Sequence, residues 1–139
     1  MLYQYVNPKV SAIRVWGDIL ISVTDGTESA SLASFSISVS NTNQAPVISG
    51  SPVGSVAEGS AYSFTPSASD PDGDNLTFSI VDKPVWASFN TATGQLSGTP
   101  GASTAGSYGN IGISVSDGTE SATLSAFQII VTAPAPGGG

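Results

Sequence analysis

Residues 22–40 read SVTDGTESASLASFSISVS, and residues 114–132 read SVSDGTESATLSAFQIIVT. The two stretches agree at 12 of 19 positions without a gap, and the second begins 92 residues after the first. Self-similarity at a fixed period is the signature of a tandem array. Because 139 residues cannot hold two complete units of that length, we expect one ending to belong to an incomplete unit.

Each stretch has the pattern of a β-hairpin that turns at an Asp-Gly pair. In the first, Asp25 and Gly26 supply the turn between strands predicted at about 18–24 and 31–40. Apolar residues alternate along the second strand at Phe35, Ile37 and Val39. These side chains need burial, and without the rest of a sandwich the hairpin's edges are expected to seek a partner.

The region after residue 45 is a series of short apolar runs separated by Gly, Pro, Asp, Asn and Ser. No long stretch has apolar residues at helical spacing, so the chain is predicted to be all-β. Strands are expected near residues 46–50, 53–57, 61–66, 75–81, 86–90, 94–98, 109–116 and 122–132. This spacing predicts an antiparallel β-sandwich of about seven strands, preceded by an extra hairpin from an incomplete repeat.

Four segments follow from this pattern. Residues 1–17 form an atypical leader that holds two of the three basic residues, although its VSAIRVW run alternates enough to be a strand. Residues 18–43 are the last hairpin of a preceding, incomplete repeat with its linker. Residues 44–133 form a complete repeat, and residues 134–139 form a Pro/Gly tail of linker type.

Charge and composition exclude several classes of function. The net charge of −7 argues against nucleic acid or an anionic membrane as a partner, because both need a basic surface. The chain has no histidine, which is the commonest general base and transition-metal ligand, and no cysteine. The acids crowd one loop and no base accompanies the serines, so no enzyme activity is expected. No apolar run is long enough to insert in a membrane.

The one dense polar cluster is the run Asp70-Pro71-Asp72-Gly73-Asp74-Asn75. Alternate carboxylates around a glycine suit Ca²⁺, which takes six to eight oxygen ligands. An EF-hand is rejected, because its twelfth position holds Val81 and no helix is predicted beside it. The alternative is a tight solvated turn in which Asp caps its own backbone.

Several motifs in order carry a family resemblance. They are AEGSAYSFTPSASDPDGDNLTFSI (57–80), PVWASFNTATGQLSGTP (84–100) and ISVSDGTESA (113–122). Together they resemble cadherin-like repeats of the dystroglycan type and the related putative Ig domains of bacterial surface or secreted proteins. The resemblance covers about 44–133 in full and 18–43 in part, and it implies an Ig-like (cadherin-like) sandwich.

The resemblance also implies calcium at the junction between repeats. Its ligands would come from Glu58, Asp70, Asp72 and Asp74, from Asp117 or Asp25, and from the linker residues Asn41 and Asn43. The chain departs from the cadherin pattern, because its linker has amides in place of acids and LSGTP stands where a D-R-E motif would be. Fewer acids imply weak binding, toward a dissociation constant of about 10⁻⁴–10⁻³ M.

Three functions follow as hypotheses. The first is a non-catalytic structural and adhesive spacer of an extracellular or cell-surface protein, which contacts neighbouring repeats and is stiffened by calcium. The second is a subunit that assembles with identical copies into swapped oligomers or filaments by strand complementation. The third is a module that binds surface polysaccharide through Tyr62, Trp86 and Tyr108, although Trp86 and Phe89 also suit the space between two sheets.

Overall fold

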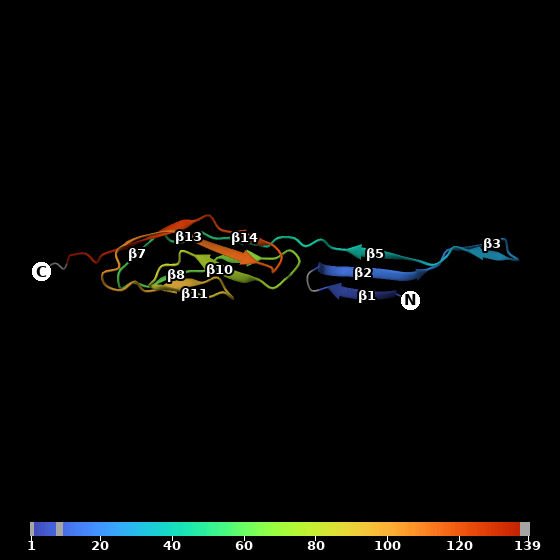
Figure 1. Ribbon diagram of the computed structural model, residues 1–139, viewed down its shortest axis with the longest axis horizontal. Coiled ribbons are helices and arrows are strands. Elements are labelled where there is room, and N and C mark those ends of the chain that lie inside the picture. The colour runs from blue at the N-terminus through green and yellow to red at the C-terminus, as the bar shows by residue number, and fades with distance from the viewer. Residues whose placement is uncertain (1, 8–9, 137–139) are drawn as a thin grey trace. The chain divides into compact units, whose positions relative to one another are not determined.

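The computed structural model describes residues 2–7 and 10–136, and the side chains of residues 15–136. It divides into two units, unit 1 (residues 1–43) and unit 2 (residues 44–139), which are described separately. Every regular element in the described part of the chain is a β-strand (Figure 1). No helix there is long and apolar enough to cross a membrane.

The described residues of unit 1 form five strands in two small sheets. The strands are β1 (Leu2–Asn7), β2 (Val10–Ile19), β3 (Ser22–Thr24), β4 (Ser29–Ser31) and β5 (Phe35–Ser40). β2 is the middle strand of an antiparallel sheet ordered β1-β2-β5, and β3 pairs only with β4 (Figure 1). The leader thus supplies two strands, and its VSAIRVW run lies within β2, which confirms that this run is a strand.

Unit 2 contains ten strands. They are β6 (Val47–Ser49), β7 (Ser55–Ala57), β8 (Tyr62–Phe64), β9 (Ser67–Ser69), β10 (Thr77–Val81), β11 (Ala87–Phe89), β12 (Leu96–Gly98), β13 (Gly106–Ser116), β14 (Ser121–Thr123) and β15 (Phe127–Thr132). One sheet has the order β10-β13-β15-β7, with β14 added to β13, and a second has the order β11-β12-β8. β6 pairs with β9. All pairs are antiparallel except β7 with β15.

The core of unit 2 lies between these sheets. Tyr62, Ala87 and Leu96 from the second sheet pack against Ile111 and Ile129 from the first. A second cluster, around Phe78, Ile113 and Val115, shares several partly buried aromatic residues with it. The fold is therefore an Ig-like β-sandwich, which confirms the predicted fold class.

The sequence repeat is also a repeat of structure. The pairing of β2 with β5 has the same register as the pairing of β13 with β15. Both ladders also contain a bulge at the same place. The bulge residues Asp18 (φ 53°) and Asn110 (φ 57°) lie 92 positions apart and share a left-handed backbone. In both Asp-Gly turns the aspartate Oδ1 accepts the amides of the next Thr and Glu, at 2.8 Å for Asp25 and 2.7 Å for Asp117.

The corresponding faces differ in burial. Ile129 and Val115 are 0% exposed in unit 2, whereas their counterparts Ile37 and Val23 are 50% and 70% exposed. The difference follows from the sheet β11-β12-β8, which covers this face in unit 2 and has no counterpart among the strands of unit 1.

Three strand predictions are wrong, and the first of these, 18–24, is divided between β2 and β3. Residues 31–40 are not a single strand, because residues 32–34 separate β4 from β5 and the two pair with different partners. Leu32 N still donates to Ile21 O at 2.9 Å, and the chain then changes its partner from β3 to β2. The predicted strand 122–132 is divided in the same way, between β14 and β15.

Candidate functional site

The acidic loop, Asp70–Asn75, follows β9 and folds around its first residue. Asp70 Oδ1 accepts the backbone amides of Asp72 at 2.8 Å and Asp74 at 3.1 Å, and Asp70 O accepts the amide of Gly73. Gly73 has φ +77°, a conformation that a residue with a side chain rarely adopts, which explains a glycine at this position. The side chain of Asp70 therefore caps the loop, as the turn interpretation predicts.

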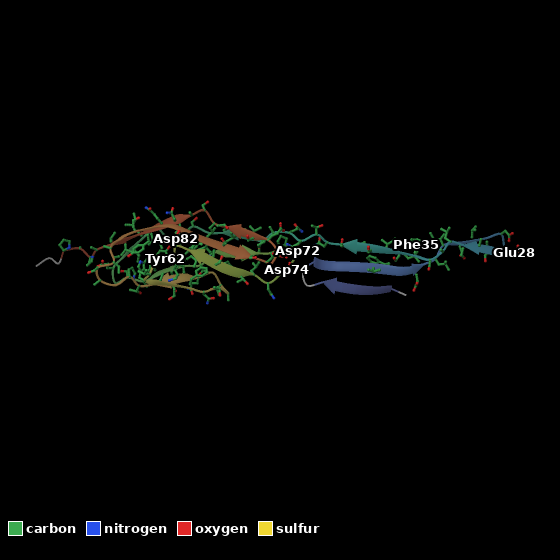
Figure 2. The ribbon with its side chains drawn as sticks, viewed as in Figure 1. Glu28, Phe35, Tyr62, Asp72, Asp74 and Asp82 are labelled. Atoms are coloured by element: carbon green, nitrogen blue, oxygen red, sulfur yellow. The ribbon has the colours of Figure 1, made fainter. Side chains whose placement is uncertain are left out.

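The same turn brings three carboxylates together. One carboxylate oxygen from each of Asp70, Asp72 and Asp74 lies within 4.8 Å of the other two, and all three residues are half-buried. Figure 2 shows Asp72 and Asp74 next to each other at one end of unit 2. Two oxygens that share one Ca²⁺ lie at most about 5 Å apart, since each sits about 2.3–2.6 Å from the ion. The cluster has the size that a single Ca²⁺ needs.

The second oxygen of Asp70 distinguishes this loop from an ordinary capped turn. Oδ2 of Asp70 is buried and has no hydrogen-bond partner among the described residues. A buried carboxylate oxygen without a donor is costly, because it has lost its water and gained nothing in exchange. A cation held between the three carboxylates would supply the missing partner, so the donor set fits a hard divalent ion.

Burial and charge repulsion within the cluster both act on the carboxyl of Asp74. Desolvation is the largest cause that raises the pKa of Asp74 above its usual value, followed by the negative charges of Asp70, Asp72 and Asp117. Asp117 therefore contributes to the electrostatics of the loop, although its own Oδ1 is engaged by the amides of Thr119 and Glu120. A bound cation would reverse the sign of this field.

One contact ties the loop to the start of unit 2. The backbone amide of Gln44 donates to Oδ2 of Asp72 at 2.7 Å, across 28 residues of sequence. Sequence reasoning missed this contact, because any residue type can donate a backbone amide. The only signal was the position of Gln44 directly after the linker.

The structure does not bring Glu58 to the acidic loop. Oε1 of Glu58 accepts the amide of Ala105, just before β13, whereas Asp117 directly follows β13. An 11-residue strand is about 35 Å long, so Glu58 and Asp117 lie at opposite ends of unit 2. A single ion cannot reach both.

The remaining candidate ligands lie in unit 1. Asn41 and Asn43 are half-buried and belong to the segment that follows β5. Asp25 accepts the amides of Thr27 and Glu28, and these hydrogen bonds lower its pKa. Asp25 therefore has the role of a turn former, and the candidate metal site of unit 2 consists of the three carboxylates of the acidic loop.

The three aromatic candidates for sugar binding pack against one another. The rings of Tyr62 and Trp86 meet edge to face at 6.1 Å, and those of Trp86 and Tyr108 at 5.9 Å. Tyr62 is only 4% exposed and its hydroxyl donates to Val53 O at 2.8 Å. Trp86 and Tyr108 are half-buried and pack against the core, so the contacts of these rings favour the core interpretation over a sugar-binding platform.

Comparison with known proteins identifies a family and several similar solved structures, two of which are described here. Residues 45–132 match the family model described as "Putative Ig domain". No curated protein matches the chain. A putative alpha-galactosidase from Bacteroides fragilis is similar at 15% identity and a TM-score of 0.49, over 64% of this chain and 17% of that one. An endo-fucoidan hydrolase of glycoside hydrolase family 107 is similar at 24% identity and a TM-score of 0.47, over 96% of this chain and 22% of that one.

Proposed function

The chain belongs to the putative Ig domain family, and from this membership we propose that it is a non-catalytic structural and adhesive repeat module of an extracellular protein. Ig-like sandwiches serve widely as modules of extracellular proteins. A spacer role is supported by the internal repeat, since modules that recur along a chain make contact with their neighbours. The sequence has no histidine, and the one cluster of acids among the described residues holds three carboxylates of a single loop, which supports a role without catalysis.

The acidic loop is the part of this module that we assign to calcium. The observation that carries the assignment is the buried Oδ2 of Asp70, which lacks a partner inside a group of three carboxylates. The loop supplies too few acids for tight binding, so we expect a dissociation constant of about 10⁻⁴–10⁻³ M, as in other extracellular modules.

Calcium at this loop would stiffen the chain where it enters unit 2. Asp72 already accepts the amide of Gln44, which directly follows the linker. An ion that orders Asp72 also orders its hydrogen-bonded partner, so binding energy would be used to fix the first residue of the unit. The mechanism involves charge neutralisation and ordering, and no bond is made or broken.

Calcium titration followed by amide NMR tests this assignment. Chelator-treated protein should show saturable shifts at Gln44, Asp72 and Gly73, and slower hydrogen exchange at the Gln44 amide. Asp70→Asn should weaken binding at least about tenfold, because it removes a charge from the ion's ligands. Asp82→Asn is the matched control, since Asp82 is an exposed acid of the same unit outside the cluster. An absence of saturable shifts up to about 10 mM calcium, or equal effects of the two variants, would refute the assignment.

A second candidate function is self-assembly through unit 1. The observation that favours it is the exposure of alternate apolar residues on β5, with Phe35 39%, Ile37 50% and Val39 52% exposed. Apolar surface of this kind is stabilised when another protein surface covers it. Oligomers or filaments formed by strand complementation would supply that cover.

A further inference from the structure

A hollow of about 470 Å³ lies on the hairpin of β11 and β12, and β11 is the end strand of its sheet (Figure 1). This site, here named the hairpin hollow, is lined by Ser88, Phe89, Asn90, Thr91, Gln95 and Ser97, none of which is charged. Pockets for small ligands have volumes of about 300–1,000 Å³. The hairpin hollow therefore has room for a ligand of that size, and no residue of the acidic loop contributes to it.

The alternation of the two strands places the polar residues of the hollow on the outer side of the sheet. Ser88 and Ser97 lie opposite each other across the hairpin, and their neighbours along each strand belong to the core. Two residues further along, the backbone amide of Asn90 donates to Gln95 O at 2.9 Å, so these two residues form the next pair on the same side. The hollow thus holds two amides and two hydroxyls on one face.

Both amide side chains of the hollow are held by hydrogen bonds within the chain. Oδ1 of Asn90 accepts the backbone amides of Ala92 at 2.8 Å and Thr93 at 3.2 Å, which leaves Nδ2 as a donor. Nε2 of Gln95 donates to Oγ of Ser63 at 3.2 Å, which leaves Oε1 as an acceptor. The hollow therefore offers a donor and an acceptor in fixed orientations, and a ligand that binds them loses less side-chain entropy.

This lining suits a neutral ligand that is rich in hydroxyls. Because no lining residue is charged, an ionic ligand would lose its water without gaining an ion pair. The amides and hydroxyls can donate to and accept from closely spaced groups, and the half-buried Phe89 adds an apolar contact. A sugar ring has this combination, since its hydroxyls both donate and accept and its C–H faces pack on aromatic rings. The net charge of −7 also opposes binding of an anionic polysaccharide.

A peptide strand also carries closely spaced neutral donors and acceptors, but the edge of β11 opposes it. A peptide would bind by adding a strand along this edge, because β11 is the end strand of its sheet. Nζ of Lys83 donates to the carbonyl oxygens of Pro84 and Ala87, which holds a positive charge against the start of β11. Lysine at a sheet edge is one of the usual protections against strand addition.

We propose that the hairpin hollow binds a neutral polysaccharide. This inference rests on the proposed adhesive role and names its partner, at a place other than the aromatic cluster of Tyr62, Trp86 and Tyr108. The hollow offers few polar groups to a ligand, so we expect a dissociation constant of about 0.1–10 mM for a single site. Several such repeats on one chain would bind a polysaccharide more tightly than one repeat does, because each further contact is intramolecular.

Titration of the full chain with cellohexaose, mannohexaose and xylohexaose, followed by amide NMR in chelator, tests the proposal. At least one of these neutral sugars should give saturable shifts at the backbone amides of residues 88–97. Asn90→Asp should weaken binding at least about tenfold, because it keeps the oxygen that accepts the turn amides and replaces the Nδ2 donor with a charged oxygen. Gln128→Glu adds the same charge to β15, outside the hollow, and should change the dissociation constant less than about twofold.

A second variant keeps the test valid if Asn90→Asp lowers the melting temperature. Ser88→Val removes a hydroxyl at an exposed strand position that suits valine, and it should weaken binding at least about threefold. Equal effects of Gln128→Glu and the hollow variants would overturn the assignment to the hollow.

Two further outcomes would also overturn the proposal. One is the absence of saturable shifts with all three sugars up to about 10 mM. This result would leave the calcium assignment intact, because calcium is detected separately at Gln44, Asp72 and Gly73. The other is saturable binding of a neutral peptide but of no sugar, which would mean strand addition at β11.

Discussion

Two isoleucines at corresponding places give the sharpest test of the repeat. Ile129 and Ile37 lie 92 positions apart in the same register, but Ile129 is 0% exposed and Ile37 is 50% exposed. Replacement of each by alanine removes the same atoms from the same kind of strand. The strand propensity and local structure of the two positions are matched. Any difference in the loss of unfolding free energy therefore measures what the covering sheet contributes.

The expected costs differ severalfold. Ile129→Ala leaves a cavity between the two sheets and should destabilise unit 2 by about 3 kcal/mol, within the usual range of 2–5 kcal/mol for buried Ile→Ala substitutions. With a urea m-value of about 1–1.5 kcal/mol/M for a unit of this size, the midpoint should fall by about 2–3 M. Ile37→Ala should leave the unfolding of unit 2 unchanged within about 0.5 kcal/mol, since Ile37 is half exposed and belongs to unit 1.

Urea unfolding followed by tryptophan fluorescence measures both variants. Each unit has one tryptophan, so a Trp16→Phe background leaves Trp86, in the core of unit 2, as the reporter. The protein should be kept near 1 μM, so that any association between copies contributes little to the unfolding curve. If Ile129→Ala does not fold, Ile129→Val should still cost about 1 kcal/mol. Equal costs at positions 37 and 129 would refute the reasoning, because they would mean that the hairpin of unit 1 also fills the sandwich.

Three further substitutions test other parts of unit 2. Gly94→Ala should lower the free energy of unfolding in urea by about 2–4 kcal/mol, because Gly94 has φ +77° and a Cβ would meet the Phe78 ring at 2.7 Å. Gly101→Ala is the control and should lower it by less than about 1 kcal/mol, because a Cβ there would meet open space. In chelator at pH 7, Asp74→Asn should raise the melting temperature. Folding raises the pKa of this carboxyl, so the ionised form destabilises the fold. The gain in melting temperature should therefore vanish as the pH falls below the ordinary Asp pKa. An unchanged melting temperature at pH 7 would contradict the clustering. Asn110→Val should cost about 1–2 kcal/mol by the same assay, because a β-branched residue is strained at φ 57°, whereas Asn110→Gly should be nearly neutral.

The fold class was readable from the sequence because its signals are local. The Asp-Gly turn at Asp25 depends on neighbouring residues alone, and a hairpin with this chemistry forms the same turn in both copies. The break at residues 32–34 was not readable. The break lies opposite a bulge in β2 at Asp18, which has a positive φ. Glycine is the usual sign of a positive φ in a sequence, and none occupies position 18.

The candidate site could likewise be predicted from the sequence only where it depends on neighbouring residues. Asp70, Asp72 and Asp74 come together because they are close in sequence, so their spacing alone predicts a cluster. The place of Glu58 depends on the parallel pairing of β7 with β15, which no local pattern encodes. The donor at Gln44 could not be predicted from its residue type, because the amide belongs to the backbone, and its position after the linker was the only signal.

The parallel pairing of β7 with β15 has a mechanical consequence. Three residue pairs join Ser55–Ala57 to Ile130–Thr132, and the flanking bonds Ile130 N to Gly54 O and Glu58 N to Thr132 O extend the ladder, each at 2.9 Å. A pull on the C-terminal end of the repeat acts along β15, across bonds that lie roughly perpendicular to the force. Such bonds shear together instead of opening one by one. We expect single-molecule pulling to show one abrupt rupture of unit 2, and proline at Ile130, which removes a bond of this ladder, to lower the rupture force. A repeat whose last strand pairs in parallel is thus suited to resist a pulling force at its C-terminal end.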